Sequence, residues 1–173
     1  IAAVSRIYLD AGAIINPELL LEEMRGLKVD PGRVTVHPNA AVITGEDLKY
    51  EANPESGAAR IAGTRKGVGR ALARKVMREG MIARDCSELA GLIGIIDLNF
   101  EMSHGASVML EVPQGFGLGV DQPFYPSVTS RVVSVSQALA DAGIHPSYLG
   151  NVLMTVRRFP IRVGGNSGGG FPD

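Results

Sequence analysis

The sequence of 173 residues has no tryptophan, a single cysteine and few aromatic residues, which make up 5% of the chain. One cysteine, Cys86, excludes an internal disulfide, and we therefore expect a protein of a reducing compartment, the cytoplasm. The formal net charge of −1 gives no general attraction to nucleic acid or to an anionic membrane. No apolar run is long enough to span a bilayer, and no signal peptide is evident.

Glycine is abundant instead, with 22 residues, and 10 prolines accompany it. This composition indicates a protein rich in loops, and loops often carry function. The length suffices for one domain with its own hydrophobic core, which we expect to span residues 1–173. Because the chain begins at Ile1 rather than Met and ends in a glycine-rich stretch, we interpret it as the internal part of a longer protein.

Apolar periodicity and the positions of glycine and proline predict strands that alternate with helices. We predict β-structure at 6–15, 33–44, 107–111 and 151–163, and helices at 16–27, 44–52, 68–80, 86–105 and 132–143. Asn16 and Pro17 are typical of a helix start, Pro38 interrupts the second β segment, and residues 53–67 are predicted to be a loop. We therefore expect an α/β fold, layered, with a largely parallel sheet flanked by helices.

The stretch GTRKGVGRA, residues 63–71, is a glycine loop that leads into a predicted helix. Its spacing does not fit a nucleotide-binding P-loop. The hydroxyl of Thr64, the cation of Lys66, the amides of Gly63 and Gly67 and the positive end of the helix nevertheless suit a phosphate group. The alternative is a basic surface turn that only caps the helix.

A second glycine-rich stretch, EVPQGFGLGVDQPFYPSVTSR, occupies residues 111–131. It does not fit a dinucleotide-binding motif, because the glycines run into prolines and not into a helix. The amide of Gln114 can donate and accept hydrogen bonds at the edge of a purine. Thr129 and Ser130 are predicted to open the next helix, where they would offer a second anion contact. Alternatively, one of them is only a helix cap and Gln114 only satisfies loop backbone.

Both stretches resemble signatures of the adenylosuccinate synthetase family. The first resembles its threonine-containing glycine loop, and the second resembles E-G-x-Q-G followed by Y-P-x-V-T-S. FPIRVGGNSG resembles a segment of the compact archaeal and phage-type members, and INPELLLEEM with HPNAAVI resembles a strand–helix connection of the family. The four stretches keep the family's order, which implies an adenylosuccinate synthetase-like, P-loop-related fold that is present in part.

The resemblance implies a C–N ligase of purine nucleotide biosynthesis. In this family, GTP or ATP first phosphorylates the 6-oxygen of IMP, and the amine of aspartate then displaces the phosphate. Mg²⁺ assists the transfer, and its ligands are expected mainly outside this chain. Some phage-type members use dGMP instead, which is the runner-up. The third possibility is a catalytically silent nucleotide-binding or dimer-forming module.

Site residues follow from matching positions. Thr64 matches the threonine that contacts the 5′-phosphate of the acceptor nucleotide, and Thr129 matches a second phosphate-binding threonine. Gln114 matches the glutamine beside the purine and is the one candidate catalytic residue. Arg78 matches an arginine that reaches the phosphate in the neighbouring subunit of a homodimer, although a solvated helix face would also explain it.

Several positions depart from the family pattern. Arg65 stands where a small residue is usual, Arg70 where proline or alanine is usual, and Val132 and Val133 where threonines are common. The family's N-terminal phosphate loop, with its aspartate base and the catalytic histidine, has no counterpart in this sequence. None of the three histidines can be assigned the missing role; they are His37, His104 and His145.

Overall fold

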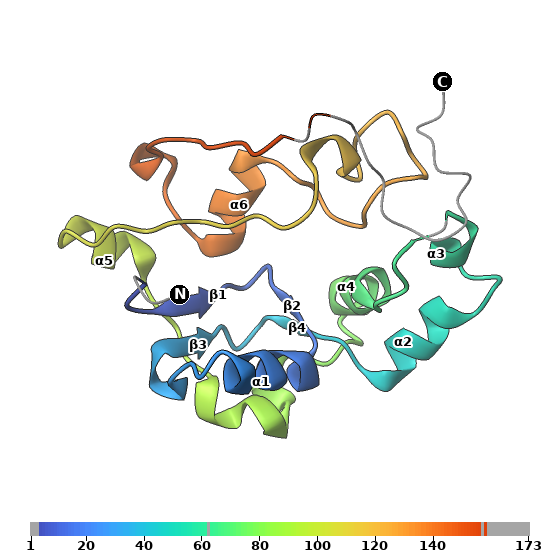
Figure 1. The fold of residues 1–173 in the computed structure, drawn as a ribbon, viewed down its shortest axis with the longest axis horizontal. Coiled ribbons are helices and arrows are strands. Elements are labelled where there is room, and N and C mark those ends of the chain that lie inside the picture. Colours follow the sequence, from blue (N-terminus) through green and yellow to red (C-terminus); the bar gives the residue numbers. More distant parts are fainter. Residues whose placement is uncertain (1–3, 62, 157, 159–173) are drawn as a thin grey trace.

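A computed structural model describes residues 4–61, 63–156 and 158 (Figure 1). Two small parallel sheets form the centre of the N-terminal layer. Strand β1 (Ile7–Leu9) pairs with β3 (Val34–Val36), and β2 (Ile14–Ile15) pairs with β4 (Ala41–Val42). The α/β fold with parallel strands is therefore confirmed.

Each of the two N-terminal β segments is divided into two short strands. Residues 10–13 turn between β1 and β2, where the amide of Gly12 donates to the carboxylate of Asp10 at 2.9 Å. The other break lies between β3 and β4 at His37 and Pro38, as the proline predicts. The chain therefore continues from one two-stranded sheet into the other on both sides.

Helix α1 (Pro17–Gly26) connects the two strand pairs and confirms the predicted helix start. Asn16 accepts a hydrogen bond from the amide of Leu19, and Pro17 occupies the first turn. The core lies between this helix, the strands and the segment that follows residue 82. Its buried members are Ile15, Met24, Val34, Val36, Ala40, Val42, Ala83, Cys86, Leu89 and Leu92.

The next helices are α2 (Gly45–Ala52), α3 (Gly57–Arg60) and α4 (Val68–Met77). Helix α3 lies inside the stretch that was predicted to be a loop. Val76 and Met77, near the end of α4, are 66% and 64% exposed. The buried residue is Ala71, because α4 approaches α2 and β4 closely through small and polar residues.

The predicted helix at 86–105 is wrong. After the 3₁₀ turn η2 (Ala83–Asp85), this range forms only a second 3₁₀ segment, η3 (Ser87–Leu92), and the short helix α5 (Leu98–Ser103). Residues between η3 and α5 continue the sheet hydrogen bonding, because the amide of Gly94 donates to the carbonyl of Val36 at 3.0 Å. A strand-like contact has displaced the helix that the apolar spacing suggested.

Two further predicted strands are not formed within the described residues. The chain at 107–111 and 151–156 has no assigned strand, and Met109, Leu153 and Val156 are 79%, 92% and 81% exposed. A strand is stabilised by its neighbours, and no described segment pairs with these two. Residues 157 and 159–163 of the second strand lie outside the described residues, as does the family-like segment FPIRVGGNSG.

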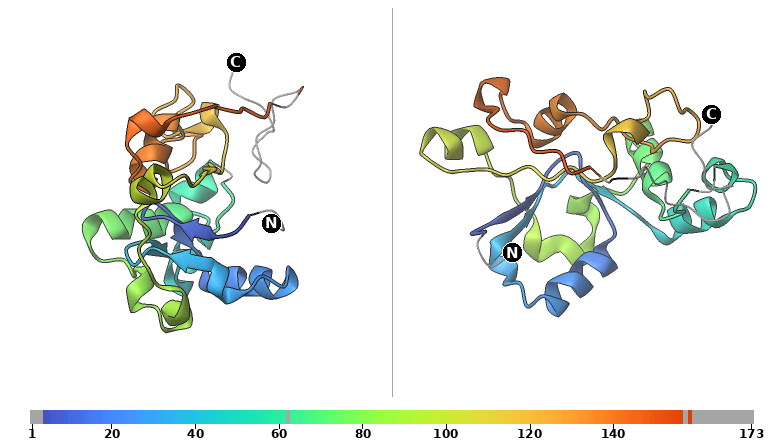
Figure 2. Two further views of the ribbon diagram at one scale, coloured as in Figure 1. Left: turned by 90° about the vertical axis from the view of Figure 1, so that its left-hand side faces the viewer. Right: turned by 45° about the horizontal axis from the view of Figure 1, so that its top comes forward.

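The helix after the second glycine-rich stretch is α6 (Val135–Ala142). Its cap is Ser134, which accepts from the amide of Gln137, so the prediction that Thr129 or Ser130 opens this helix is wrong. In both views of Figure 2, the chain from α5 to residue 156 lies along one side of the layer built by β1–β4 and α1. Among the described helices, none has the length and apolar content needed to cross a membrane.

Candidate functional site

The glycine loop at 63–67 connects α3 to α4. Thr64, Arg65 and Lys66 are all exposed, so their side chains are available to a ligand. Gly63 is held by a hydrogen bond from its amide to the carbonyl of Ala58 at 2.7 Å. The loop is thus anchored at its start and presents its basic and hydroxyl side chains to the surface.

Gly67 ends the loop in a conformation that requires glycine. Its φ is +79°, and a Cβ atom there would lie 2.7 Å from Cγ2 of Ile43. Its amide donates to one carboxylate oxygen of Glu51 at 2.7 Å, and the amide of Arg70 donates to the other at 3.0 Å. The positive end of α4, which we expected to receive a phosphate, is therefore already occupied by a carboxylate of the same chain.

A second acidic side chain of α2 supports the same junction. Asp47 is 1% exposed; its carboxylate accepts from the amide and hydroxyl of Thr44 and from Arg74 at 3.0 Å. Burial raises the pKa of Asp47, but the bonds from Thr44 and Arg74 outweigh burial and hold this pKa below its usual 3.8.

Gln114 and Thr129 are brought together by the second glycine-rich stretch. The hydroxyl of Thr129 donates to the side-chain oxygen of Gln114 at 2.8 Å. The stretch folds back on itself through backbone bonds from Thr129 to Leu118 and from Val120 to Arg131, at 2.7 and 2.9 Å. Gln114 is exposed and Thr129 is half-buried, which leaves the amide nitrogen of Gln114 accessible to a ligand.

The two stretches meet at the first turn of α4. A Cβ atom on Gly69 would lie 3.3 Å from a carboxylate oxygen of Glu51 and 3.4 Å from Cβ of Ser130. Glycine at this position therefore lets the segment that carries Thr129 pack directly on the helix that follows the Thr64 loop. Arg70, which stands where the family usually has proline or alanine, packs against Tyr50, with its guanidinium 4.4 Å from the centre of the ring.

Arg78 lies at the opposite end of α4. It is exposed, ends the helix with φ of +66°, and donates weakly to the carbonyl of Val76 at 3.4 Å. With a rise of about 1.5 Å per residue, the helix separates Arg78 from the glycine loop by about 15 Å. The structure therefore groups Gln114 with Thr129, and places Arg78 at a distance from Thr64.

Backbone strain marks the same segments. Arg65, Arg78 and Gln114 have positive φ values of 53°, 66° and 77°, and Lys28 is the other non-glycine residue of the described chain with such a value. A positive φ is unfavourable for residues with a Cβ atom and is maintained only where the surroundings enforce it. Three of the four positions therefore fall in or beside the segments that were singled out from the sequence.

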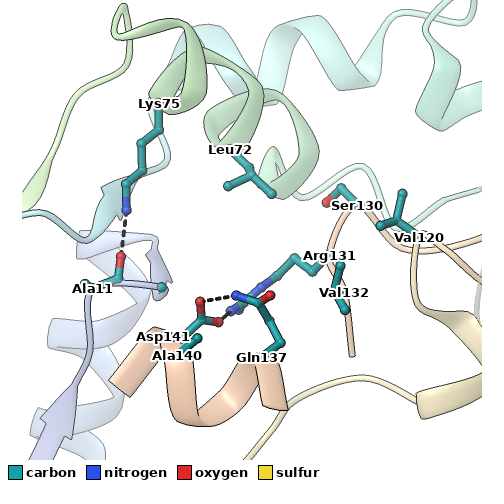
Figure 3. A pocket seen from close by; sticks show the side chains of 11 residues that line it. Ala11, Leu72, Lys75, Val120, Ser130, Arg131, Val132, Gln137, Ala140 and Asp141 are labelled. Carbon is teal, nitrogen blue, oxygen red and sulfur yellow. Dashed lines mark hydrogen bonds and ion pairs between the residues drawn. The ribbon is translucent and has the colours of Figure 1, made fainter. Parts of the chain in front are cut away.

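A cavity of about 380 Å³ lies next to these segments, between α4, α6 and the turn at 11–12 (Figure 3). Arg131 pairs with Asp141 at 2.7 Å, and Gln137 donates to the second oxygen of Asp141, also at 2.7 Å. Lys75 donates to the carbonyl of Ala11 at 2.6 Å. These polar residues line the cavity wall and are all engaged with one another or with backbone.

Sequence reasoning missed this polar group. Its signal was present, because Gln137 and Asp141 lie four residues apart, and so on one face, in a helix made mostly of apolar residues. Burial lowers the pKa of Lys75 and raises the pKa of the nearby Asp10, so the charged forms of both side chains are disfavoured here.

The described residues do not contain a group of three or more His, Cys, Asp or Glu side chains that could hold a metal ion. The acidic residues nearest the glycine loop, Asp47 and Glu51, are engaged by Arg74 and by backbone amides. They do not fit a magnesium site.

Comparison with known proteins shows clear relatives. A family profile described as adenylosuccinate synthetase matches residues 94–172. A protein of Vibrio phage phiVC8, named N6-succino-2-amino-2′-deoxyadenylate synthase, is 33% identical over 98% of this chain and 52% of its own length. The adenylosuccinate synthetase of Archaeoglobus fulgidus is 32% identical over 97% of this chain and 49% of its own length.

Solved structures of the same kinds of protein are also similar to this chain. Succinoaminodeoxyadenylate synthetase of cyanophage S-2L, solved with dGMP and with dATP as an energy donor, is 31% identical, with a TM-score of 0.70 over 84% of this chain and 43% of that chain. Adenylosuccinate synthetase of Plasmodium falciparum, at 19% identity, shares the fold, with a TM-score of 0.80 over 91% of this chain and 48% of that chain. This chain therefore spans about half the length of the relatives that it matches.

Proposed function

Because the chain is a partial member of the adenylosuccinate synthetase family, covering about half the length of its relatives, we propose that it carries the acceptor-nucleotide site of such a ligase. The observation that supports this site best is the bond between Thr129 and Gln114, beside the first turn of α4. It combines a hydroxyl for a phosphate with an amide for a purine edge, and the Thr64 loop precedes the same helix.

The proposed reaction joins aspartate to C6 of IMP with hydrolysis of GTP or ATP. The 6-oxygen is a poor leaving group until it is phosphorylated, and the α-amine of aspartate then attacks C6 and expels phosphate. In this scheme Thr64 and Thr129 hold the 5′-phosphate of the acceptor, with the cation of Lys66 nearby. The amides of Gly63 and Gly67, which the sequence also suggested for the phosphate, are already bonded to Ala58 and Glu51. Gln114 holds the purine edge and orients C6 for both steps.

Mg²⁺ would supply charge stabilisation for phosphoryl transfer, and its ligands are expected mainly outside this chain. The triphosphate and aspartate also require groups that these residues do not provide. Activity of the chain by itself is therefore part of the proposal to be tested, with a silent nucleotide-binding module as the alternative outcome. The cytoplasmic location that we expect from the sequence stays a prediction.

A phage-type enzyme that acts on dGMP is the second candidate. It is supported by the 33% identity to the phiVC8 protein and by the likeness to the S-2L structure with dGMP. The two acceptors differ by a 2-amino group and a 2′-hydroxyl. Calorimetric titration of the chain with IMP and with dGMP, at equal concentration, separates the two candidates by which nucleotide binds more tightly.

We also propose a homodimer in which Arg78 contacts the phosphate held by the neighbouring subunit. The position of Arg78 at the far end of α4 supports this role, because about 15 Å of helix keeps it from the loop of its own chain. Arg78→Leu should weaken nucleotide binding only in a dimer. Sedimentation measured with the titration tests this, and normal binding by the dimeric variant would contradict it.

A turnover assay with aspartate and either triphosphate completes the test. Binding followed by phosphate release supports a ligase activity within this chain. Binding without turnover supports an acceptor site whose chemistry needs further residues. A chain that binds neither IMP nor dGMP contradicts the proposed site.

A further inference from the structure

Glu51 is a buried carboxylate whose partners are backbone amides. It lies near the end of α2 and is 6% exposed. Within the described residues it has no ion pair, and its two oxygens accept from the amides of Gly67 and Arg70 at 2.7 and 3.0 Å. A charge in such surroundings is stable only because these bonds and the positive end of α4 compensate for lost hydration.

This arrangement changes how a phosphate can bind. The free amides of a helix start are the usual anion site of a glycine loop. Here Glu51 already uses two of them, and its negative charge repels a second anion at the same place. A nucleotide phosphate must therefore be held by the preceding part of the loop, where Thr64 and Lys66 are exposed.

The same carboxylate also fixes how the two ligand-bearing stretches meet. Gly69 lies between Glu51 and Ser130, with a Cβ position 3.3 Å from the one and 3.4 Å from the other. Ser56, which is 7% exposed, donates to the backbone carbonyl of Glu51 at 3.0 Å and caps α3 by accepting from the amide of Ala59. Glu51 thus connects the end of α2, the start of α3 and the start of α4.

We propose that Glu51 is a positioning residue for phosphate recognition. By holding the amides of Gly67 and Arg70, it fixes the end of the glycine loop, so that Thr64 faces the 5′-phosphate without any contact between Glu51 and the nucleotide. The proposal rests on the proposed function, because it assigns the phosphate of the acceptor nucleotide to this loop.

The test compares Glu51→Gln with the matched control Glu55→Gln in the full chain. Glu55 is exposed and lies four residues further along, and its side chain makes no hydrogen bond or ion pair to the residues that the structure describes. Each variant is titrated with IMP and with inosine, which lacks the phosphate, and the same is done with dGMP and deoxyguanosine. Glu51→Gln keeps the size of the side chain, but its NH₂ group replaces one carboxylate oxygen. A hydrogen-bond donor then lies opposite one of the two backbone N–H groups.

We expect Glu51→Gln to weaken nucleoside monophosphate binding about tenfold and to leave nucleoside binding unchanged. A purely structural role would weaken both ligands together. Glu51→Asp, which keeps the charge, should restore part of the nucleotide affinity, and Glu55→Gln should match the wild-type chain. Hydrogen exchange at Gly67 and Arg70 should become faster in Glu51→Gln and, to a smaller extent, in Glu51→Asp, and should stay unchanged in Glu55→Gln.

The outcomes are separable. If the wild-type chain binds no purine monophosphate, the proposed function fails. If the wild-type chain binds but Glu51→Gln leaves the ratio of nucleotide to nucleoside affinity unchanged, only the role of Glu51 fails. If Glu51→Gln does not fold, Glu51→Asp decides: unchanged exchange at Gly67 and Arg70 with an unchanged affinity ratio would overturn the proposal.

Discussion

The two stretches that carry the candidate site are built in opposite ways. Around the glycine loop, Asp47 and Glu51 are 1% and 6% exposed. Glu51 holds the start of α4 through backbone amides, and Asp47 holds its last turn through Arg74. In the other stretch, Gln114 is exposed, Thr129 is half-buried, and the two side chains share one hydrogen bond of 2.8 Å. One half of the site is thus fixed by folding, whereas the other is only lightly held.

Because of this difference, we expect one half to affect the stability of the fold and the other to affect ligand affinity. Buried carboxylates with hydrogen-bond partners contribute to the stability of the fold. Removing one partner of such a pair lowers the free energy of unfolding strongly. An exposed bond contributes little to stability but is available for a ligand. Mutations in the first half should therefore change the free energy of unfolding, and mutations in the second half should change affinity alone.

The largest effect is expected from Asp47→Asn. This variant removes the charge that Arg74 and Thr44 surround, and leaves Arg74 facing a neutral group. We expect a loss of about 3 kcal/mol in the free energy of unfolding, measured with urea. Glu46→Gln is the control, because Glu46 is 85% exposed and 3.7 Å from the same guanidinium. The control should lose less than about 0.5 kcal/mol; equal losses would refute the contrast between buried and exposed pairs.

Gly67→Ala should have the next largest effect. An alanine at φ of +79° is strained, and its Cβ would approach Ile43 to 2.7 Å. We expect about 2 kcal/mol of destabilisation, together with weaker nucleotide binding, because the loop end must shift. Gly26→Ala, where nothing lies within 4 Å of the new Cβ, should be neutral or slightly stabilising in thermal unfolding. A stable Gly67→Ala chain would show that the loop conformation is not enforced.

Local signals accounted for much of the fold. Asn16 and Pro17 predicted the start of α1, and Pro38 predicted the break between β3 and β4. The helix predicted at 86–105 failed because a bond from Gly94 to Val36 joins residues 58 positions apart, and local spacing carries no information about such a contact. The strands predicted at 107–111 and 151–156 failed because a strand needs a partner, and pairing is not a property of one segment.

The site residues also divide into those that the sequence revealed and those that only the structure revealed. The glycine loop, Gln114 and Thr129 stand out in the sequence because glycine, amide and hydroxyl residues have recognisable local uses. Glu51 did not stand out, because its role depends on amides 16 and 19 residues away that meet it only after α2 and α4 pack together. Buried carboxylates with backbone partners are therefore found from the structure and not from a motif.

Gln114→Ala tests the lightly held half. We expect purine monophosphate affinity to fall about tenfold, which corresponds to about 1.4 kcal/mol, since the amide at the purine edge is lost. The free energy of unfolding should stay within about 0.5 kcal/mol of wild type, because Gln114 is exposed. Gln122→Ala, in the same stretch, is the control and should bind normally. A Gln114→Ala chain that unfolds early but binds normally would reverse the assignment of the two halves.

The smallest effect on the free energy of unfolding is expected from a change of pH. It tests whether Asp47 is held more firmly than an exposed carboxylate. Because the pKa of Asp47 in the folded chain lies below 3.8, its stabilisation is complete above that pH and is lost as pH falls through the folded-state pKa. Asp10 acts in the opposite direction, since burial raises its pKa and protonation relieves that penalty. Urea unfolding below pH 4 should therefore show a steeper loss for wild type than for Asp47→Asn. Parallel curves would mean that Asp47 is no better held than an exposed carboxylate, and the contrast between the two halves would fail.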